Sequence, residues 1–343
     1  LDLCIENEDI VPFVEAVWNV DLYPTQREIV NTIFFKKNTR IAINTYTRYG
    51  KTFSVALALM TVIYVKGIHG LRIGLAGPSF SDAELVRNEL LKIGIRFEGF
   101  QDIIDTRRGS DPEDLIKSSK KEKLTFYDGR TELELVSASG GVSNGLAGTG
   151  KGSGAMGKGF DYLVLDESTR VPWSAWKKFL SRLLEHEDAV RVEMANPWHK
   201  QNHFYQHWMD EDVATFFVDE ETGLEENRHS KNWFDRQAKE VGGRDTLEWK
   251  VLYESVFPDR SEHGLIGFSE FNSAKKGFGW EEKVKAEGFV PDGVFFGFDV
   301  AGEGKDKAVL IRGVRFGDWW EVSDVWSREY VEDTMELVGW ASS

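Results

Sequence analysis

Short apolar or β-branched runs alternate with segments of helical apolar spacing through the first two thirds of the chain. Four of these runs predict strands, at 40–46, 71–76, 162–165 and 190–194. Helices are predicted from Lys51 onward and over 81–93. Because such alternation is typical of a mainly parallel sheet covered by helices, we predict an α/β fold.

A hairpin interrupts this alternation. The runs 123–126 and 131–136 flank the turn Asp128-Gly129, which is a typical hairpin signal. The segment 139–159 that follows is rich in glycine and serine, a composition that buries little apolar surface. We predict a mobile loop there.

The pattern changes again after about residue 252. A linker is predicted around 257–261, and new strands are predicted at 294–300, 307–314 and 319–325. The predicted division is a first domain over 1–255, a linker over 256–285 and the beginning of a second domain over 286–343.

Composition places the chain among ordinary globular proteins. Hydrophobic residues make up 41% and aromatic residues 13% of the 343 residues, which is ample for a core and unlike a disordered chain. The net charge of −15 argues against a protein that coats nucleic acid through a generally basic surface. The basic run 117–123 is interpreted as a solvated loop.

Neither a disulfide nor a membrane span is predicted. Cys4 is the single cysteine, which favours a reducing compartment. The apolar run 53–65 is shorter than the roughly 18 residues that a spanning helix needs, and the acidic start of the chain differs from a signal peptide. We expect a cytoplasmic protein with no membrane partner.

A phosphate-binding loop is predicted where the strand at 40–46 leads into a helix. The segment 45–52, TYTRYGKT, would present backbone N–H groups and a helix N-terminus to phosphates. Lys51 would reach the β- and γ-phosphates of ATP, and the Thr52 hydroxyl would bind Mg²⁺. Thr45 stands where the general motif has glycine, and a plain strand-to-helix turn is the alternative. The predicted nucleotide-binding residues of the loop are Arg48, Tyr49, Gly50, Lys51 and Thr52.

A second glycine-rich match, GLAGTGK at 145–151, is interpreted as a decoy. Gly152 stands where a serine or threonine is required, and neither a strand before the segment nor a helix after it is predicted. We assign it to the glycine-rich loop.

Two adjacent carboxylates follow the next apolar strand. The sequence FDYLVLDE at 160–167 ends in Asp166 and Glu167, and the carboxyl edge of a parallel sheet is where ligands bind. We expect Asp166 to hold Mg²⁺ and Glu167 to orient and deprotonate the attacking water. A helix cap at the strand end is the alternative for this pair.

Three further polar residues are candidates for nucleotide contacts. Asn196, in the motif Ala-Asn-Pro after the strand at 190–194, would sense the γ-phosphate, although an ordinary Asn-Pro turn is the alternative. Tyr23 and Gln26 precede the first strand and would contact adenine by stacking and hydrogen bonding, or would simply begin a helix.

His199, His203 and His207 are spaced four residues apart, as on one face of a helix. Such spacing can mimic a metal site, but no cysteine or well-placed carboxylate is evident to complete a ligand set. Aromatic residues are interleaved with these histidines, so we predict a packed aromatic helix.

Together these motifs resemble the large terminase subunit, the DNA-packaging ATPase of tailed viruses. The glutamine motif at Gln26, the RYGKT loop at 48–52, the LVLDE box at 163–167 and the Ala-Asn-Pro motif at 195–197 follow one another in the family's order. The resemblance implies a P-loop ATPase domain of the RecA-like (ASCE) class that uses ATP and Mg²⁺, and it makes Asn196 a coupling residue.

The resemblance also implies the partners of a packaging motor. These are double-stranded DNA, the portal of a procapsid and a small terminase subunit. The active form would be a homo-oligomeric ring in the cytoplasm of the host cell.

A nuclease of the RNase H-like type is expected after the ATPase in this family. The segment FFGFDVAGEGKD at 295–306 looks like the first strand of such a domain, with Asp299 as a ligand of Mg²⁺ or Mn²⁺. A simple Asp/Gly hairpin turn is the alternative. Glu303 and Asp306 are expected to be solvated. The remaining ligands should lie beyond Ser343, as if the nuclease were truncated.

One departure from the family's pattern concerns the arginine finger that often reaches a neighbouring subunit's ATP. In the glycine-rich segment where that arginine is expected, this chain has Lys151, Met156 and Lys158. The position of the phosphate-loop arginine also varies within the family, so the resemblance implies a γ-phosphate contact for Arg48 less directly than it implies the role of Lys51.

Two other functions remain open at this point. A helicase-like DNA translocase shares the glutamine motif, the P-loop and the Asp-Glu box, but the strands over 294–325 do not supply a second motor domain. A non-catalytic nucleotide-binding assembly scaffold is the third hypothesis, and the presence of Lys51 and Glu167 argues against it.

Overall fold

The computed structural model describes residues 1–105, 123–137, 159–178, 187–259, 269–270, 273, 290–299 and 307–329. The chain divides into two compact units, Leu1–Phe268 and Ser269–Ser343, each with its own sheet. Most of the predicted linker 256–285 lies outside the described residues, and so do 138–158 of the predicted mobile loop, so both stay predictions.

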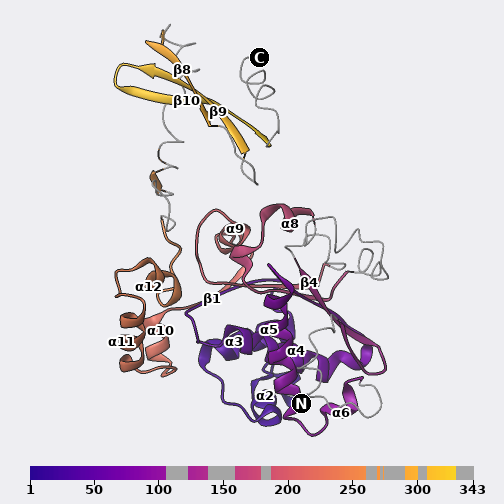
Figure 1. Cartoon of the computed structure of the whole chain (residues 1–343). Coiled ribbons are helices and arrows are strands. Elements are labelled where there is room, and N and C mark those ends of the chain that lie inside the picture. The colour runs from indigo at the N-terminus through magenta and orange to yellow at the C-terminus, as the bar shows by residue number, and fades with distance from the viewer. Residues whose placement is uncertain are drawn as a thin grey trace. The chain divides into compact units, whose positions relative to one another are not determined.

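The first unit is built on a seven-stranded sheet of order β3-β4-β2-β5-β6-β1-β7 (Figure 1). Its strands are β1 (Arg40–Thr45), β2 (Arg72–Gly77), β3 (Lys123–Phe126), β4 (Thr131–Ser137), β5 (Tyr162–Leu165), β6 (Val190–Met194) and β7 (Ala214–Val218). The β3–β4 hairpin is antiparallel and every other neighbouring pair is parallel. The predicted α/β fold with a mainly parallel sheet is confirmed.

Helices cover both faces of this sheet, because its strands are apolar on both faces. On β5, Tyr162 and Val164 pack on one side, while Leu163 and Leu165 pack on the other. Helices α3 (Pro24–Phe35), α4 (Lys51–Lys66) and α5 (Phe80–Ile95) cover the first face. The short helices α8 (Trp173–Lys178) and α9 (His203–Trp208) cover the second (Figure 1).

Helix α4 is the central core helix. Ten consecutive residues from Ser54 to Ile63 are buried, which explains its nearly unbroken apolar sequence. Together with the 3₁₀ turn Gly67–His69 it is long and apolar enough to cross a membrane, so the expectation that this run is too short was wrong. Since 61% of the apolar window is buried inside the fold, packing in the core accounts for its composition.

The remaining α-helices in the described part of the first unit are short. They are α1 (Asp2–Glu6), α2 (Val11–Trp18), α6 (Phe100–Ile103), α10 (Glu220–Glu225), α11 (Lys231–Glu240) and α12 (Leu247–Leu252). Helices α11 and α12 contribute Phe234 and Trp249 to an aromatic cluster that also contains Tyr46 and Tyr49 of the β1–α4 loop. The tail of this unit therefore packs directly on the predicted phosphate-binding loop.

The second unit contains a three-stranded antiparallel sheet of order β10-β9-β8. Its strands are β8 (Gly293–Asp299), β9 (Lys307–Phe316) and β10 (Trp319–Glu329). Gly317 has a φ of +58° in the tight turn between β9 and β10, a conformation that glycine adopts readily. The three predicted strands are present, and the RNase H-like assignment stays a prediction.

Candidate active site

The β1–α4 loop turns sharply into the N-terminus of helix α4 at Gly50. Gly50 precedes helix α4 with a φ of +115°, and a Cβ atom there would lie 2.8 Å from Nε2 of Gln26. Glycine is therefore needed on both conformational and steric grounds. Lys51 and Thr52 are the first two residues of α4, at the end where helix N–H groups are free.

Two buried tyrosines anchor this loop from behind. The Tyr49 hydroxyl donates to Oε2 of Glu226 at 2.5 Å, and the Tyr46 hydroxyl shares a hydrogen bond of 2.8 Å with Nδ1 of His229. Burial, and then the bond to Glu226, raise the pKa of Tyr49 far above its ordinary value, so it stays a neutral donor. Because its ring is buried, Tyr49 offers only its backbone to a nucleotide.

Gln26 supports the same loop and also caps helix α3. Its Nε2 donates to the Tyr49 carbonyl at 3.2 Å, and its Oε1 accepts from the Tyr23 backbone N–H at 3.2 Å. The helix-start alternative for this pair is thus present in the fold, and the Gln26 amide is already engaged at both ends. The Tyr23 ring lies 4.9 Å from the guanidinium carbon of Arg228.

Asp166 and Glu167 follow β5 at the carboxyl edge of the sheet. Asp166 is 3% exposed, and Glu167 has a φ of +49° and donates its N–H to Oδ1 of Asp166 at 2.9 Å. Burial, followed by the charge of Glu167, raises the pKa of Asp166 to about 7 although Lys51 opposes the shift. Burial lowers the pKa of Lys51 against the pull of Glu167 and Asp166. These three groups therefore form one electrostatic unit.

Asn196 connects the two halves of this unit. The order of the sheet places β6 between β5 and β1. Asn196, two residues beyond the end of β6, therefore lies between the acidic pair and the β1–α4 loop. Asn196 Oδ1 accepts a hydrogen bond from Lys51 Nζ, and its Nδ2 donates to Thr47 Oγ1 at 3.0 Å. Its backbone carbonyl accepts from Thr169 Oγ1 at 3.1 Å.

The residues present fit a divalent cation bound together with an anion. A buried aspartate beside a second carboxylate is costly without a positive charge, and burial and the charge of Glu167 both raise the pKa of Asp166. The Thr52 hydroxyl at the start of α4 is the second oxygen ligand expected from the motif. Asp166 and Thr52 could hold Mg²⁺.

Arg228 was not identified from the sequence. It lies between α10 and α11, donates to the Arg48 carbonyl at 3.5 Å, and has a buried Nε without a hydrogen-bond partner among the described residues. Arg48 itself is exposed with a φ of +77°. The only sequence signal was the polar stretch 225–229, which looks like any surface loop.

The prediction for the three histidines needs a correction. Helix α9 begins at His203, so His199 is not on it. A well-placed carboxylate does exist: Glu193 on β6 faces Nδ1 of both His203 and His207, at 3.1 and 2.7 Å. The sequence could not reveal this, because the contact depends on packing of α9 against the alternate residues of β6.

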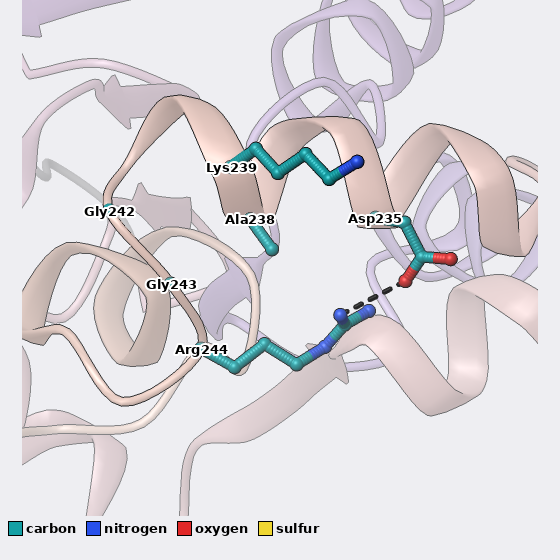
Figure 2. A pocket seen from close by; sticks show the side chains of 6 residues that line it. All are labelled: Asp235, Ala238, Lys239, Gly242, Gly243 and Arg244. Atoms are coloured by element: carbon teal, nitrogen blue, oxygen red, sulfur yellow. Dashed lines mark hydrogen bonds and ion pairs between the residues drawn. The ribbon is translucent and has the colours of Figure 1, made fainter.

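A hollow of about 650 Å³ on α11 is separate from these residues (Figure 2). It is lined by Asp235, Ala238, Lys239, Gly242, Gly243 and Arg244. Arg244 is ion-paired with Asp235 at 3.0 Å and with Glu220 at 2.5 Å, so carboxylates of the protein itself already balance its charge. None of the predicted site residues lines this hollow.

Asp299 ends β8 in the second unit and is exposed. Its register partner on β9 is Val309, which pairs with Ser327 on β10. No carboxylate from a described strand shares this row. The predicted neighbours Glu303 and Asp306 lie outside the described residues, as do Lys151, Met156 and Lys158.

The arrangement of the first unit matches solved structures of phage large terminases. The Thermus phage P74-26 large terminase ATPase domain superposes with a TM-score of 0.51 at 14% identity, covering 71% of this chain and 96% of that one. The HK97 bacteriophage large terminase gives 0.55 at 17% identity, covering 90% and 63%. The first unit has the fold of a large-terminase ATPase domain. The large terminase of bacteriophage D6E gives 0.51 at 11% identity, covering 93% and 73%.

Sequence comparison alone does not reach this result. No protein-family model and no curated protein sequence matches the chain. The similarity to large terminases is therefore seen in the tertiary structure, at sequence identities too low for a secure sequence alignment. The chain spans 63% of the HK97 protein, so the activities of a whole terminase are a matter of proposal.

Proposed function

We propose that this chain is the ATP-hydrolysing subunit of a viral DNA-packaging motor. The observation that carries the proposal is the bridge formed by Asn196, which bonds Lys51 on one side and Thr47 on the other. This bridge joins the segment after β6 to the loop that precedes α4, beside the buried carboxylate of Asp166 and the half-buried one of Glu167. The large-terminase fold supports the same reading.

The residues divide the work of ATP hydrolysis among them. Lys51 and the N–H groups at the start of α4 would bind the phosphates, and Arg48 and Arg228 would add positive charge near them. Glu167 would orient and deprotonate the attacking water. Tyr23, with Gln26 behind it, would face the base of the nucleotide.

Magnesium would be held by Thr52 and Asp166. When bound, the ion would offset phosphate charge and the charge of the buried aspartate. Lys51 would then exchange its contact with Asn196 for a phosphate oxygen, which frees the Asn196 amide to respond to the γ-phosphate. Asn196 is thereby proposed as the coupling residue between hydrolysis and movement.

The partners proposed are those of a packaging motor. They are double-stranded DNA, the portal of a procapsid and a small terminase subunit, with a homo-oligomeric ring acting inside the host cell. Asp299 is proposed as a Mg²⁺ or Mn²⁺ ligand of a nuclease that needs further carboxylates from elsewhere.

A steady-state ATPase assay on the purified 343-residue chain tests the proposal. We expect Mg²⁺-dependent hydrolysis that double-stranded DNA stimulates and that Glu167→Gln abolishes without loss of ATP binding. Binding of ATP without hydrolysis by the unaltered chain would favour the nucleotide-binding scaffold. Unwinding of duplex DNA without any binding to procapsids would favour the helicase-like translocase.

A further inference from the structure

Glu193 is a buried carboxylate with an unusual number of partners. It is 1% exposed, and its oxygens accept from Ser168 Oγ at 2.9 Å, His203 Nδ1 at 3.1 Å and His207 Nδ1 at 2.7 Å. The Arg191 Nε lies 2.9 Å from Oε1. Burial would raise the pKa of Glu193, but the two imidazole bonds and the Arg191 charge hold it well below its ordinary range. The carboxylate is therefore ionised and saturated.

A metal ion is the other reading of this cluster. Possible ligand atoms of Glu193, His203 and His207 all lie within 4.8 Å of one another. However, both imidazoles direct Nδ1 at the carboxylate as hydrogen-bond donors, and the Arg191 guanidinium competes for the oxygen that a cation would need. Trp176 holds this arrangement by stacking on His203 at 4.6 Å. The Glu193 carboxylate is thus fully engaged without an ion, while Nε2 of His203 is buried without a hydrogen-bond partner among the described residues.

The cluster reaches the active site through Ser168. This serine is fully buried and directly follows Glu167, whose φ of +49° is uncommon for a residue with a side chain. Such a backbone conformation persists only where its surroundings hold it. The 3₁₀ turn Ser168–Arg170 is tied to the end of β6 twice, by Ser168 to Glu193 and by Thr169 to the Asn196 carbonyl at 3.1 Å.

We infer that Glu193 is a positioning residue for ATP hydrolysis, which acts through Ser168 to hold the backbone turn that aims Glu167. The inference rests on the proposed role of Glu167 in activating water. It explains why a charged side chain lies on the buried face of a central strand. A small displacement of a catalytic group, of about 1 Å, lowers the turnover rate far more than it lowers the affinity for the substrate.

Two substitutions test the link, with kcat and KM measured separately. Ser168→Ala and Glu193→Gln should each lower kcat by roughly 10- to 100-fold, while KM for ATP stays within about twofold because the β1–α4 loop is unchanged. If Glu193 acts through Ser168, the double variant should be no slower than the slower single variant.

A matched control removes a buried hydroxyl at the amino ends of the parallel strands, away from the carboxyl ends where the site lies. Thr131, at the amino end of β4, donates to the Gly67 carbonyl at 2.7 Å and accepts from the Leu71 N–H at 3.1 Å. Thr131→Val should lower the thermal unfolding temperature yet keep the kcat of the unaltered chain. Loss of kcat in Ser168→Ala but not in Thr131→Val then reports the connection to Glu167 rather than general instability.

Several outcomes would overturn the inference. Wild-type kcat in both Ser168→Ala and Glu193→Gln, with Glu167→Gln inactive, would leave the proposed function intact and remove Glu193 from it. The same conclusion would follow if the two losses of kcat multiplied in the double variant, or if a rise in KM for ATP accounted for the whole loss of kcat/KM. Should Glu193→Gln fail to fold, Ser168→Ala decides alone. An active Glu167→Gln would instead refute the proposed role of Glu167.

Discussion

Asp166 and Asp299 both end apolar strands, yet they lie in opposite surroundings. Asp166 is 3% exposed and shares its electrostatic environment with Glu167 and Lys51. Asp299 is exposed, and its row across the second sheet contains Val309 and Ser327. The same local pattern therefore places Asp166 among charged groups in one unit, while in the other no described strand contributes a second carboxylate to the row of Asp299.

The difference comes from strand direction. In a parallel sheet the carboxyl ends of neighbouring strands meet at one edge, so the residues after β1, β5 and β6 gather there. In the antiparallel sheet of the second unit the carboxyl end of β8 meets the amino end of β9. Polar strand ends converge only where the topology brings equivalent ends together.

The largest effect is expected for Lys51→Ala, which removes the positive charge of the converging site. Loss of contacts to two phosphates should lower kcat/KM for ATP by roughly 100-fold or more, since a charged hydrogen bond contributes about 1.5–3 kcal/mol. The control is Lys36→Ala, whose partner Asp188 lies 2.7 Å away and outside this site. Equal turnover in both variants would remove Lys51 from the reaction.

For Asn196→Ala the expected loss of ATPase activity is smaller, about tenfold, while DNA translocation should be lost almost completely. The amide contacts Lys51 and Thr47, so its removal disturbs the signal between the loop and β6 more than the chemistry. Measuring ATP consumed per base pair moved separates the two effects. Proportional loss of both activities would make Asn196 an ordinary active-site residue.

Asp166→Asn should stabilise the protein when neither nucleotide nor magnesium is present. Because burial raises the pKa of Asp166 to about 7, the folded state disfavours its ionised form, and this penalty grows from about pH 4 and is complete above pH 7. Urea unfolding at pH 8 should therefore show a gain on the order of 3 kcal/mol that shrinks toward pH 5.

An exposed aspartate provides the control for that measurement. Asp245→Asn should leave the free energy of unfolding nearly unchanged at both pH values. If Asp166→Asn behaves in the same way, or destabilises the chain at pH 8, then the ionised Asp166 does not destabilise the folded protein.

The smallest effect is expected for Asp299→Ala, which should leave ATP turnover of the 343-residue chain unchanged. Two-metal hydrolysis needs several carboxylates that hold ions about 4 Å apart, and Asp299 has no such partner in its strand row. The unaltered chain should therefore not cleave DNA in a manganese-containing nuclease assay. Robust cleavage would show that the nuclease site has been misassigned.

Local patterns were enough to predict most strands of this fold. The predicted strands at 162–165 and 190–194 match β5 and β6 residue for residue, and α4 begins at Lys51 as expected. Apolar periodicity and the tripeptide Gly50-Lys51-Thr52 carry this information in neighbouring residues. Strand β7 was missed, because the run ATFFV does not alternate apolar and polar residues, although its positions at the edge of the sheet alternate between exposed and buried.

The sequence by itself determined which residues are candidates for chemistry: short motifs marked Lys51, Asp166, Glu167 and Asn196. Only the tertiary structure decided how they are connected, because the sheet order sets β6 between β5 and β1 and turns Asn196 into a bridge. It also decided the contacts of Glu193, which lies ten residues before His203 on a different element. Contacts between elements depend on packing over long distances along the chain, and no local periodicity records them.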